Sequence, residues 1–291
     1  MTGKIVKNIS NDYTVESSGN RYVCKVRGKI RTLDIKPQVG DNVIFDDVNN
    51  YIVEILPRVN YLRRPPVSNV DQAFIITSSK EPDFSSNLLD KLINIIEFNN
   101  IEPIICFTKL DLLNNEEKKE IDSIIAYYKK IGYKVLRNTE FEKINSLFKG
   151  KVSVFTGQSG AGKSTLLNNL DKKLNIKTNE ISKALGRGKH TTRHTELLKV
   201  SGGLVADTPG FSSLDMREMT KADIRDNMIE FNKYRDLCFY KDCMHINEED
   251  CEIKRQVGKN ILKSRYDNYI KFIEGDNNET IGFNSKFKRK K

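Results

Sequence analysis

The segment from Gly157 to Ser164, GQSGAGKS, fits the phosphate-loop pattern GxxxxGK[ST] at every fixed position. An apolar stretch over residues 152–155 precedes it and predicts a strand, and residues 164–170 follow it with the pattern of a helix. Glycines let such a loop wrap around a phosphate and point backbone N–H groups inward. A chance glycine-rich turn is the alternative, and the flanking strand and helix argue against it. The segment therefore predicts a P-loop nucleotide-binding fold.

Two side chains of this loop have specific expected roles. Lys163 would supply a positive charge to the β- and γ-phosphates, and Ser164 would offer its hydroxyl to Mg²⁺. The residues of the loop expected to bind nucleotide are Gly157, Gln158, Ser159, Gly160, Ala161, Gly162, Lys163, Ser164 and Thr165. A phosphate loop alone does not distinguish an ATPase, a nucleotide kinase or a GTPase.

The choice of base is indicated by the sequence TKLD, which fits the [NT]KxD pattern of guanine-specific GTPases and follows a strand predicted over residues 103–107. Asp111 can accept hydrogen bonds from the guanine N1–H and N2–H₂ groups, and adenine lacks that pair of donors. Lys109 can lie along the base. The residues expected to read the base are Thr108, Lys109, Leu110 and Asp111.

A third motif, DTPG, fits DxxG and follows a strand predicted over residues 204–206. Asp207 would hold Mg²⁺ through water, and the N–H of Gly210 would meet the γ-phosphate. A surface turn is the alternative, and the presence of the two other motifs argues against it. The order is permuted, because TKLD precedes the phosphate loop here and follows it in ordinary small GTPases. A parallel sheet tolerates this order because each motif depends on its place at a strand end.

The chain on either side of these motifs predicts further domains. Five short predicted strands with turn residues between them indicate a small barrel of the OB type. These strands cover residues 4–9, 12–16, 21–26, 42–46 and 51–56. A basic run lies in this region, which favours RNA binding, with a solvated barrel rim as an equally good explanation. The run consists of Lys25, Arg27, Lys29, Arg31 and Lys36.

The sequence Arg63-Arg64-Pro65-Pro66 interrupts the strand pattern and indicates a domain linker, because adjacent prolines block helices and central strands. Strands then alternate with helices, which predicts an α/β sheet; Ser85 or Ser86 is available to cap the first of these helices. From about residue 220 the pattern is helical and polar. We expect three domains: an RNA-binding barrel over 1–62, a GTPase domain over 63–220, and a helical zinc-binding domain over 221–291 with a disordered basic tail.

A cluster of cysteines near the end of the chain has the ligand types of a zinc site. Cys238-x₄-Cys243-x-His245-x₅-Cys251 supplies three thiolates and one imidazole, which suit a closed, tetrahedral, structural Zn²⁺. Reduced cysteines beside a surface histidine are the alternative. A short polar segment has no core that could bury all four side chains, so a single structural zinc ion is favoured.

The composition of the chain limits its partners and its location only weakly. The formal net charge of +10 favours contact with a polyanion, although a soluble basic protein without such a partner is the alternative. The 291 residues contain no run of eighteen apolar residues and begin without the apolar stretch of a signal peptide. We therefore expect a cytoplasmic protein that makes no contact with a membrane.

The complete set of motifs resembles the circularly permuted, ribosome-associated GTPases of bacteria, the RsgA (YjeQ/YloQ) family. The resemblance covers nearly the whole chain and includes the barrel, TKLD, GQSGAGKST, the segment Gly186–His194, DTPG and the cysteine cluster. It implies a GTPase that binds the small ribosomal subunit and its rRNA late in assembly and is stimulated by it. A monomer is expected.

The resemblance also suggests roles for the segment between the phosphate loop and DxxG. Thr192, in preference to Thr191, would close on Mg²⁺ and the γ-phosphate. Phe211 follows DxxG where other GTPases carry a glutamine that orients water, so the resemblance assigns the catalytic role to His190. An imidazole can orient or polarise water near neutral pH. The alternative is that His190 contacts RNA phosphate or caps its loop.

Two other functions are compatible with parts of this sequence. An RNA-binding scaffold in which GTP is mainly structural is one, and the complete phosphate-loop and DxxG motifs argue against it. A P-loop nucleotide kinase or ATPase is the other, and TKLD argues against that.

Overall fold

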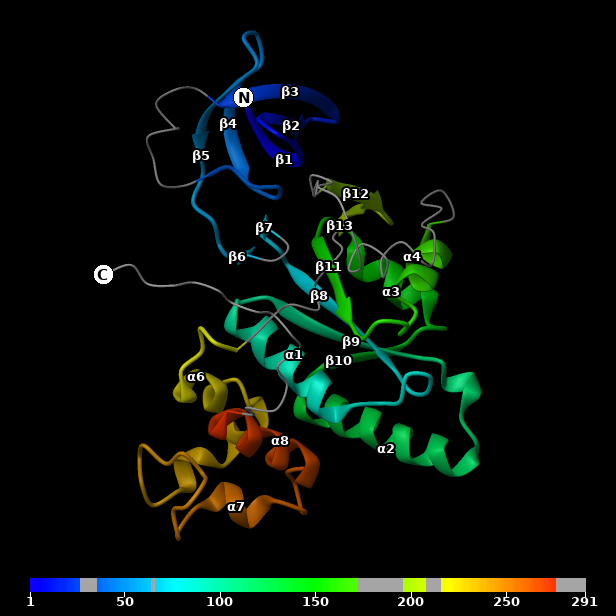
Figure 1. Cartoon of the computed structure of the whole chain (residues 1–291), viewed down its shortest axis with the longest axis vertical. Helices are drawn as coiled ribbons and strands as arrows, with labels where there is room; N and C mark the ends of the chain where they lie inside the picture. Colours follow the sequence, from blue (N-terminus) through cyan, green and yellow to red (C-terminus); the bar gives the residue numbers. More distant parts are fainter. Residues whose placement is uncertain (27–35, 64–65, 172–195, 208–215, 276–291) are drawn as a thin grey trace, which may run out of the picture. The chain divides into compact units, whose positions relative to one another are not determined.

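The computed structural model describes residues 1–26, 36–63, 66–171, 196–207 and 216–275 (Figure 1). His190, Thr192 and Gly210, which the sequence singles out, lie outside these residues, as do the basic tail and most of the basic run. The chain forms two compact units, Met1–Glu218 and Met219–Lys291, which are described separately below.

The first unit begins with the predicted five-stranded barrel. Its strands are β1 (Thr2–Ile9), β2 (Asp12–Ser17), β3 (Asn20–Val26), β4 (Asn42–Asp46) and β5 (Tyr51–Ile55). Neighbouring strands pair in the order β1-β2-β3-β5-β4, and β4 closes the barrel by pairing with β1. The β3–β5 pairing is parallel and the others are antiparallel. This topology confirms the prediction of an OB-type barrel. Its interior is apolar and includes Ile5, Val15, Cys24, Val43, Phe45 and Ile52.

Arg63 and Pro66, the two ends of the predicted linker, belong to two short strands, β6 (Tyr61–Arg63) and β7 (Pro66–Ser68), which pair antiparallel. This ladder was not predicted, because proline is normally excluded from sheets. Pro66 is tolerated since the two-stranded ladder consists of edge strands, where one N–H is not needed for pairing.

The second part of this unit is a sheet whose strands run in the order β10-β9-β8-β11-β13-β12. The strands are β8 (Gln72–Ser78), β9 (Glu102–Thr108), β10 (Lys134–Arg137), β11 (Val152–Gly157), β12 (Glu196–Val200) and β13 (Gly203–Asp207). All pairings from β10 to β13 are parallel, as predicted. All seven residues of β8 are buried, as expected for a central strand covered on both faces.

Helices α1 (Ser86–Phe98), α2 (Asn115–Ile131), α3 (Phe141–Phe148) and α4 (Lys163–Leu170) accompany this sheet. Alternate residues of β8 contact different helices, because successive side chains of a strand point to opposite faces. Phe74 and Ile76 belong to a buried cluster that includes side chains of α3 and α4, and Ile75 lies with apolar side chains of α1. Ser85 is the N-cap of α1 and accepts a hydrogen bond from the N–H of Leu88, as its sequence predicts.

Strand β12 was not predicted, and it is antiparallel to β13. Ser201 and Gly202 join the two strands with φ angles of 49° and 78°, the backbone of a tight hairpin turn. The other edge of β12 pairs with the barrel strand β1. Lys7 of β1 faces Glu196 of β12, and their side chains form an ion pair of 2.6 Å. Barrel and α/β sheet are therefore joined through β12 in the described part of the first unit.

The second unit consists of short helices: α6 (Lys221–Asp226), α7 (Glu252–Gln256), α8 (Lys263–Glu274) and the 3₁₀ turns η4 (Ile229–Lys233) and η5 (Arg235–Leu237). Its small core contains Phe231 against Tyr269, with ring centroids 5.1 Å apart. Arg265 is fully buried and forms a bidentate ion pair with Glu230. Its Nε and Nη2 donate to the two carboxylate oxygens at 2.7 and 2.8 Å. The helical prediction for this region is confirmed.

Candidate functional site

The phosphate loop connects β11 directly to α4, since β11 ends at Gly157 and α4 begins at Lys163. Gly157 has a φ of 127°, and a Cβ built on it would lie 2.0 Å from the carbonyl oxygen of Ile76 in β8. Only glycine fits this position, because the neighbouring group is backbone that belongs to a central strand. The first glycine of the pattern is thus required by the packing of the sheet beneath the loop.

Lys163 is hydrogen-bonded to the first residues of its own loop. Its Nζ donates hydrogen bonds of 2.8 Å to the carbonyl oxygens of both Gly157 and Gln158. Burial lowers the pKa of Lys163 to about 8. A phosphate near this ammonium group would favour its charged form. Ser164, the next residue, is buried in the first turn of α4.

The first residue of TKLD is bonded to the phosphate loop. Thr108 is the last residue of β9, and its hydroxyl donates a hydrogen bond of 2.7 Å to the carbonyl oxygen of Ala161. Lys109 follows in the left-handed region, at a φ of 57°, and its Nζ donates a hydrogen bond to the carbonyl oxygen of Glu81. Asp111 is exposed in the 3₁₀ turn Leu110–Leu112. The structure thereby brings together the segments predicted to read the base and to bind phosphate, and the two bonded residues lie 53 positions apart in the chain.

The third motif begins at the same edge of the sheet. Asp207 is the last residue of β13, and β13 pairs in parallel with β11. The segments that follow β9, β11 and β13 therefore leave the sheet at the carboxyl ends of parallel strands, where α/β proteins bind their ligands. The described part of the site comprises the phosphate loop, TKLD and the start of DxxG. The contact between Lys109 and Glu81 was not predicted, because the sequence contains no signal for it.

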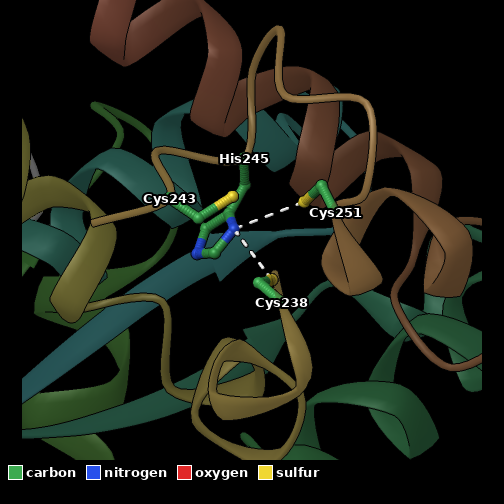
Figure 2. Close-up of side chains that lie close together, drawn as sticks. All are labelled: Cys238, Cys243, His245 and Cys251. Carbon is green, nitrogen blue, oxygen red and sulfur yellow. Dashed lines mark hydrogen bonds between the residues drawn. The ribbon is translucent and has the colours of Figure 1, made fainter. Parts of the chain in front are cut away.

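The structure also brings the four predicted metal ligands of the second unit together (Figure 2). The ligand atoms of Cys238, Cys243, His245 and Cys251 all lie within 4.8 Å of one another. Nδ1 of His245 is 3.7 Å from Sγ of Cys238 and 3.4 Å from Sγ of Cys251. A tetrahedral zinc site has Zn–N near 2.0 Å and Zn–S near 2.3 Å, which implies an N···S separation of about 3.5 Å. The distances from His245 to Cys238 and Cys251 fit this geometry, and Cys243 lies close enough to supply the fourth ligand of one metal ion.

The protonation of this cluster also suits a metal site. Burial lowers the pKa of His245 to about 4, so its imidazole is neutral at neutral pH and Nδ1 can act as a ligand. Burial raises the pKa of Cys243 to about 12. A bound cation would counter that effect, because a coordinating thiol is deprotonated by the metal. Nε2 of His245 is buried and has no hydrogen-bond partner among the described residues.

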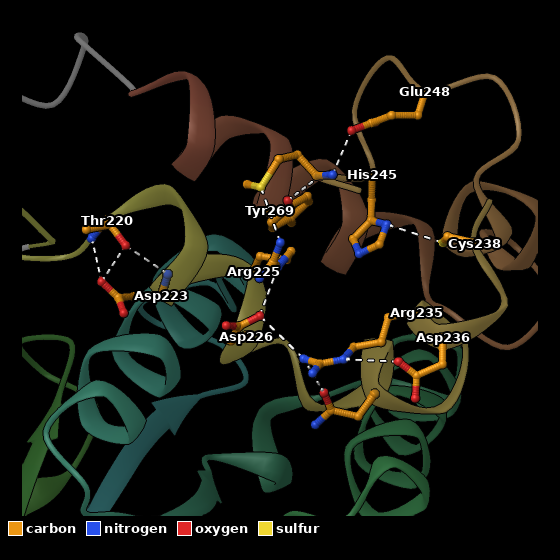
Figure 3. Close-up of polar contacts among 12 residues, drawn as sticks. Thr220, Asp223, Arg225, Asp226, Arg235, Asp236, Cys238, His245, Glu248 and Tyr269 are labelled. Atoms are coloured by element: carbon orange, nitrogen blue, oxygen red, sulfur yellow. Dashed lines mark hydrogen bonds and ion pairs between the residues drawn. The ribbon is translucent and has the colours of Figure 1, made fainter. Parts of the chain in front are cut away.

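A layer of backbone contacts holds the ligand loop in place. The carboxylate of Glu248 accepts a hydrogen bond of 2.6 Å from the N–H of Met244 (Figure 3) and one of 2.8 Å from the N–H of Ile246. These two residues flank His245, whose backbone is in the left-handed region at a φ of 60°. The hydroxyl of Tyr266 donates to the carbonyl oxygen of His245 at 2.7 Å. Neither Glu248 nor Tyr266 was predicted, although the place of Glu248 between the ligands His245 and Cys251 was a signal.

No helix in the described part of the chain has both the length and the apolar character needed to cross a membrane.

Comparisons with known proteins agree over most of the chain. The family described as RsgA GTPase matches residues 55–217, and the RsgA N-terminal domain matches residues 2–52. A curated protein of Oceanobacillus iheyensis, small ribosomal subunit biogenesis GTPase RsgA 2, is 47% identical over 281 residues, which cover 94% of this chain and 96% of that protein.

Two solved structures are similar over nearly their full length. One is described as YloQ, a circularly permuted GTPase, with a TM-score of 0.79, 36% identity, and coverage of 94% of this chain and 93% of the other. The other is YjeQ from Thermotoga maritima, with a TM-score of 0.81, 32% identity, and coverage of 94% and 97%.

Proposed function

The chain belongs to the RsgA family of GTPases, and from this premise we propose that it binds the small ribosomal subunit and assists its late maturation. It is a hydrolase that acts on GTP. In the proposal it converts GTP to GDP and phosphate, and the subunit stimulates this reaction. It acts as a monomer in the cytoplasm, where its partners are the subunit and its rRNA.

One observation carries the nucleotide part of the proposal: the hydrogen bond from Thr108 to the carbonyl oxygen of Ala161. Because this bond holds TKLD against the phosphate loop, a single nucleotide can contact both segments. Asp111 would accept the guanine N1–H and N2–H₂ groups, and Lys163 would exchange its two loop carbonyl partners for phosphate oxygens. Ser164 and Thr192 are the proposed Mg²⁺ ligands, with Asp207 acting through water. Bound Mg²⁺ supplies positive charge that neutralises the phosphates.

His190 is proposed to orient the water that attacks the γ-phosphate. The water forms a bond to phosphorus as the bond between phosphorus and the β–γ bridging oxygen breaks, and GDP leaves. Phe211 has no hydrogen-bonding group for this task. The N–H of Gly210 would contact the γ-phosphate. The DxxG loop would therefore lose this contact when GTP is hydrolysed.

We assign the cluster of Cys238, Cys243, His245 and Cys251 to one structural Zn²⁺. Three sulfurs and one imidazole suit zinc, and four protein ligands leave no position open for catalysis. The N···S distances of 3.4 and 3.7 Å support tetrahedral coordination. The metal would stabilise residues 221–291 as a domain separate from the barrel (1–62) and the GTPase domain (63–220).

The barrel offers a surface suited to RNA. Lys25 of β3 faces Tyr51 of β5 in the parallel ladder, and both side chains are exposed. Val23 and Val53, on the same two strands, are also exposed. An aromatic ring beside a cation can stack on an unpaired base while the cation contacts phosphate. We propose that this face contributes to rRNA binding.

The test is the GTPase rate with small subunits, large subunits or free rRNA added separately. Stimulation by small subunits alone supports the proposal. Equal rates under all conditions, together with tight binding to the small subunit, would favour an RNA-binding scaffold in which GTP is mainly structural. Competition by GDP but not by ADP excludes a nucleotide kinase or ATPase.

A further inference from the structure

The loop between the first two candidate metal ligands presents large apolar side chains to solvent. Leu237, Phe239 and Tyr240 are 66%, 75% and 53% exposed, and we call these three residues the apolar tip. The rings of Phe239 and Tyr240 lie edge to face, with centroids 5.0 Å apart. Single exposed apolar residues are ordinary on protein surfaces, but two exposed rings in contact, with an exposed leucine two residues away in the chain, are the side chains of an interaction surface.

The backbone of the apolar tip is held at several points. Cys238 and Cys243 bracket Phe239 and Tyr240 in the chain, and both belong to the candidate metal cluster. The N–H of Phe239 donates to the carbonyl oxygen of Asp250 at 3.2 Å, and the N–H of Cys243 donates to that of Tyr240 at 3.3 Å. Because the loop is already ordered, a partner would lose little conformational entropy when it covers these rings.

The charges around the tip decide which partner it fits. Residues 236–250 contain five acidic side chains and a single basic one, Lys241. The side chain of Asp236 is 89% exposed and Asp242 is exposed as well, while Asp250 is 64% exposed and forms an ion pair of 2.8 Å with Arg255. The carboxylate of Asp236 lies 3.8 Å from Arg235, on the turn that leads into Cys238 (Figure 3).

Residues 219–275 as a whole carry no excess of positive charge. Residues 219–275 contain eleven acidic and eleven basic side chains, so they contribute none of the formal net charge of +10. A surface that binds nucleic acid needs an excess of positive charge to neutralise phosphates. An apolar group with an acidic rim instead complements a basic protein surface with an apolar pocket.

We propose that the apolar tip docks into a basic protein of the small ribosomal subunit. Phe239 and Tyr240 fill an apolar pocket, and lysine or arginine side chains of that protein face Asp236 and Asp242. Exposed aromatic side chains on an ordered loop are the residue types that dominate binding at protein interfaces. The inference rests on the proposed function and adds to it a protein contact beside the rRNA contact of the barrel.

The test compares the full-length, zinc-loaded wild type with the double variant Phe239→Ser/Tyr240→Ser in binding to purified small subunits. The matched control is Val59→Ser, which removes a 74% exposed apolar side chain that lies outside the barrel strands. We expect the double variant to bind about tenfold more weakly or worse, and the control to bind as the wild type does. Zinc content and the GTPase rate without subunits should be unchanged in both proteins, which shows that both are folded.

Two further measurements identify the partner. A photoreactive phenylalanine at position 240 should crosslink to a ribosomal protein, and Asp242→Lys should weaken binding by reversing the rim charge. A crosslink confined to rRNA, or tighter binding by Asp242→Lys, would overturn the inference. So would wild-type affinity of the double variant. If the wild type itself fails to bind small subunits, the proposed function falls and the inference falls with it.

Discussion

Thr108 and Ala161 are joined by a hydrogen bond of 2.7 Å between the threonine hydroxyl and the alanine carbonyl oxygen, although 53 residues separate them. Both residues are buried. The bond fixes the distance between the segment that follows β9 and the segment that follows β11. In the proposed function it therefore sets the spacing at which one nucleotide contacts both segments.

The first prediction follows from this bond. Thr108→Val keeps the shape of the side chain but leaves the Ala161 carbonyl without its donor. A hydrogen bond of this kind contributes about 0.5–1.5 kcal/mol, so we expect the Kd for GDP to rise by about 2–13-fold. Thr108→Asn, which restores a donor, should recover affinity. Titration calorimetry measures both, and identical affinity of Thr108→Val and wild type would show that the bond has no role in binding.

The second prediction concerns the choice of base. Asp111→Asn replaces a carboxylate that accepts two hydrogen bonds with an amide that can accept with only one of its two groups. We expect the preference for GTP over ATP to fall by at least about tenfold, since a pair of hydrogen bonds to a charged acceptor is weakened. Competition binding with GDP and ADP measures the ratio. An unchanged ratio would mean that TKLD does not read the base.

The third prediction is a pH dependence. Burial lowers the pKa of Lys163 to about 8 in the free protein, and bound phosphate should raise it. Above pH 8 the free protein therefore carries fewer protons at this site than the complex, and binding takes up a proton. Affinity for GDP should fall as pH rises above about 8, by up to about tenfold per unit, with no contribution from this group below that pH.

Lys163→Arg is the control for this measurement, because a guanidinium stays protonated throughout the range. Titration of the guanine ring affects both proteins equally and cancels in the comparison. Parallel pH profiles of the two proteins would rule out Lys163 as the titrating group. Lys163→Ala should sharply weaken nucleotide binding and hydrolysis at every pH.

The fourth prediction concerns the metal. One Zn²⁺ per chain should copurify with the wild type, and Cys243→Ser should lose it. The binding free energy of a structural zinc ion is about 10–16 kcal/mol in small domains and is coupled to folding, so residues 219–275 should become sensitive to protease. Cys24→Ala, in the barrel, should retain the metal. A metal-free wild type with a protease-resistant C-terminal unit would contradict the assignment.

The fifth prediction concerns the buried ion pair between Glu230 and Arg265. Both side chains are almost completely buried, and the two hydrogen bonds between them measure 2.7 and 2.8 Å. Glu230→Ala should destabilise this unit by about 3–5 kcal/mol, because it leaves a buried guanidinium without its carboxylate. The double variant Glu230→Leu/Arg265→Met should destabilise this unit less than Glu230→Ala does. Chemical denaturation of the full chain, monitored within this unit, measures the difference.

Local signals in the chain predicted much of this protein. The barrel strands, the helix that begins after Ser85 and the phosphate loop were all expected, because strand alternation, helix capping and glycine spacing act over a few residues. Strand β12 was missed, even though Ser201 and Gly202 form a tight turn beside it. Five residues of mixed polarity are a weak strand signal until a partner strand is known, and here the partners are β13 and the barrel strand β1.

The sequence by itself determined which chemical groups this protein carries: the phosphate-binding loop, the TKLD carboxylate and the three cysteines with one histidine. Their spacing along the chain was enough, because each motif is a local arrangement of backbone and side chain. Only the tertiary structure decided that Thr108 meets Ala161, that Nδ1 of His245 faces the sulfurs, and that a Cβ at Gly157 would collide with Ile76. These contacts join residues distant in sequence or depend on the packing of neighbouring elements, so no pattern along the chain records them.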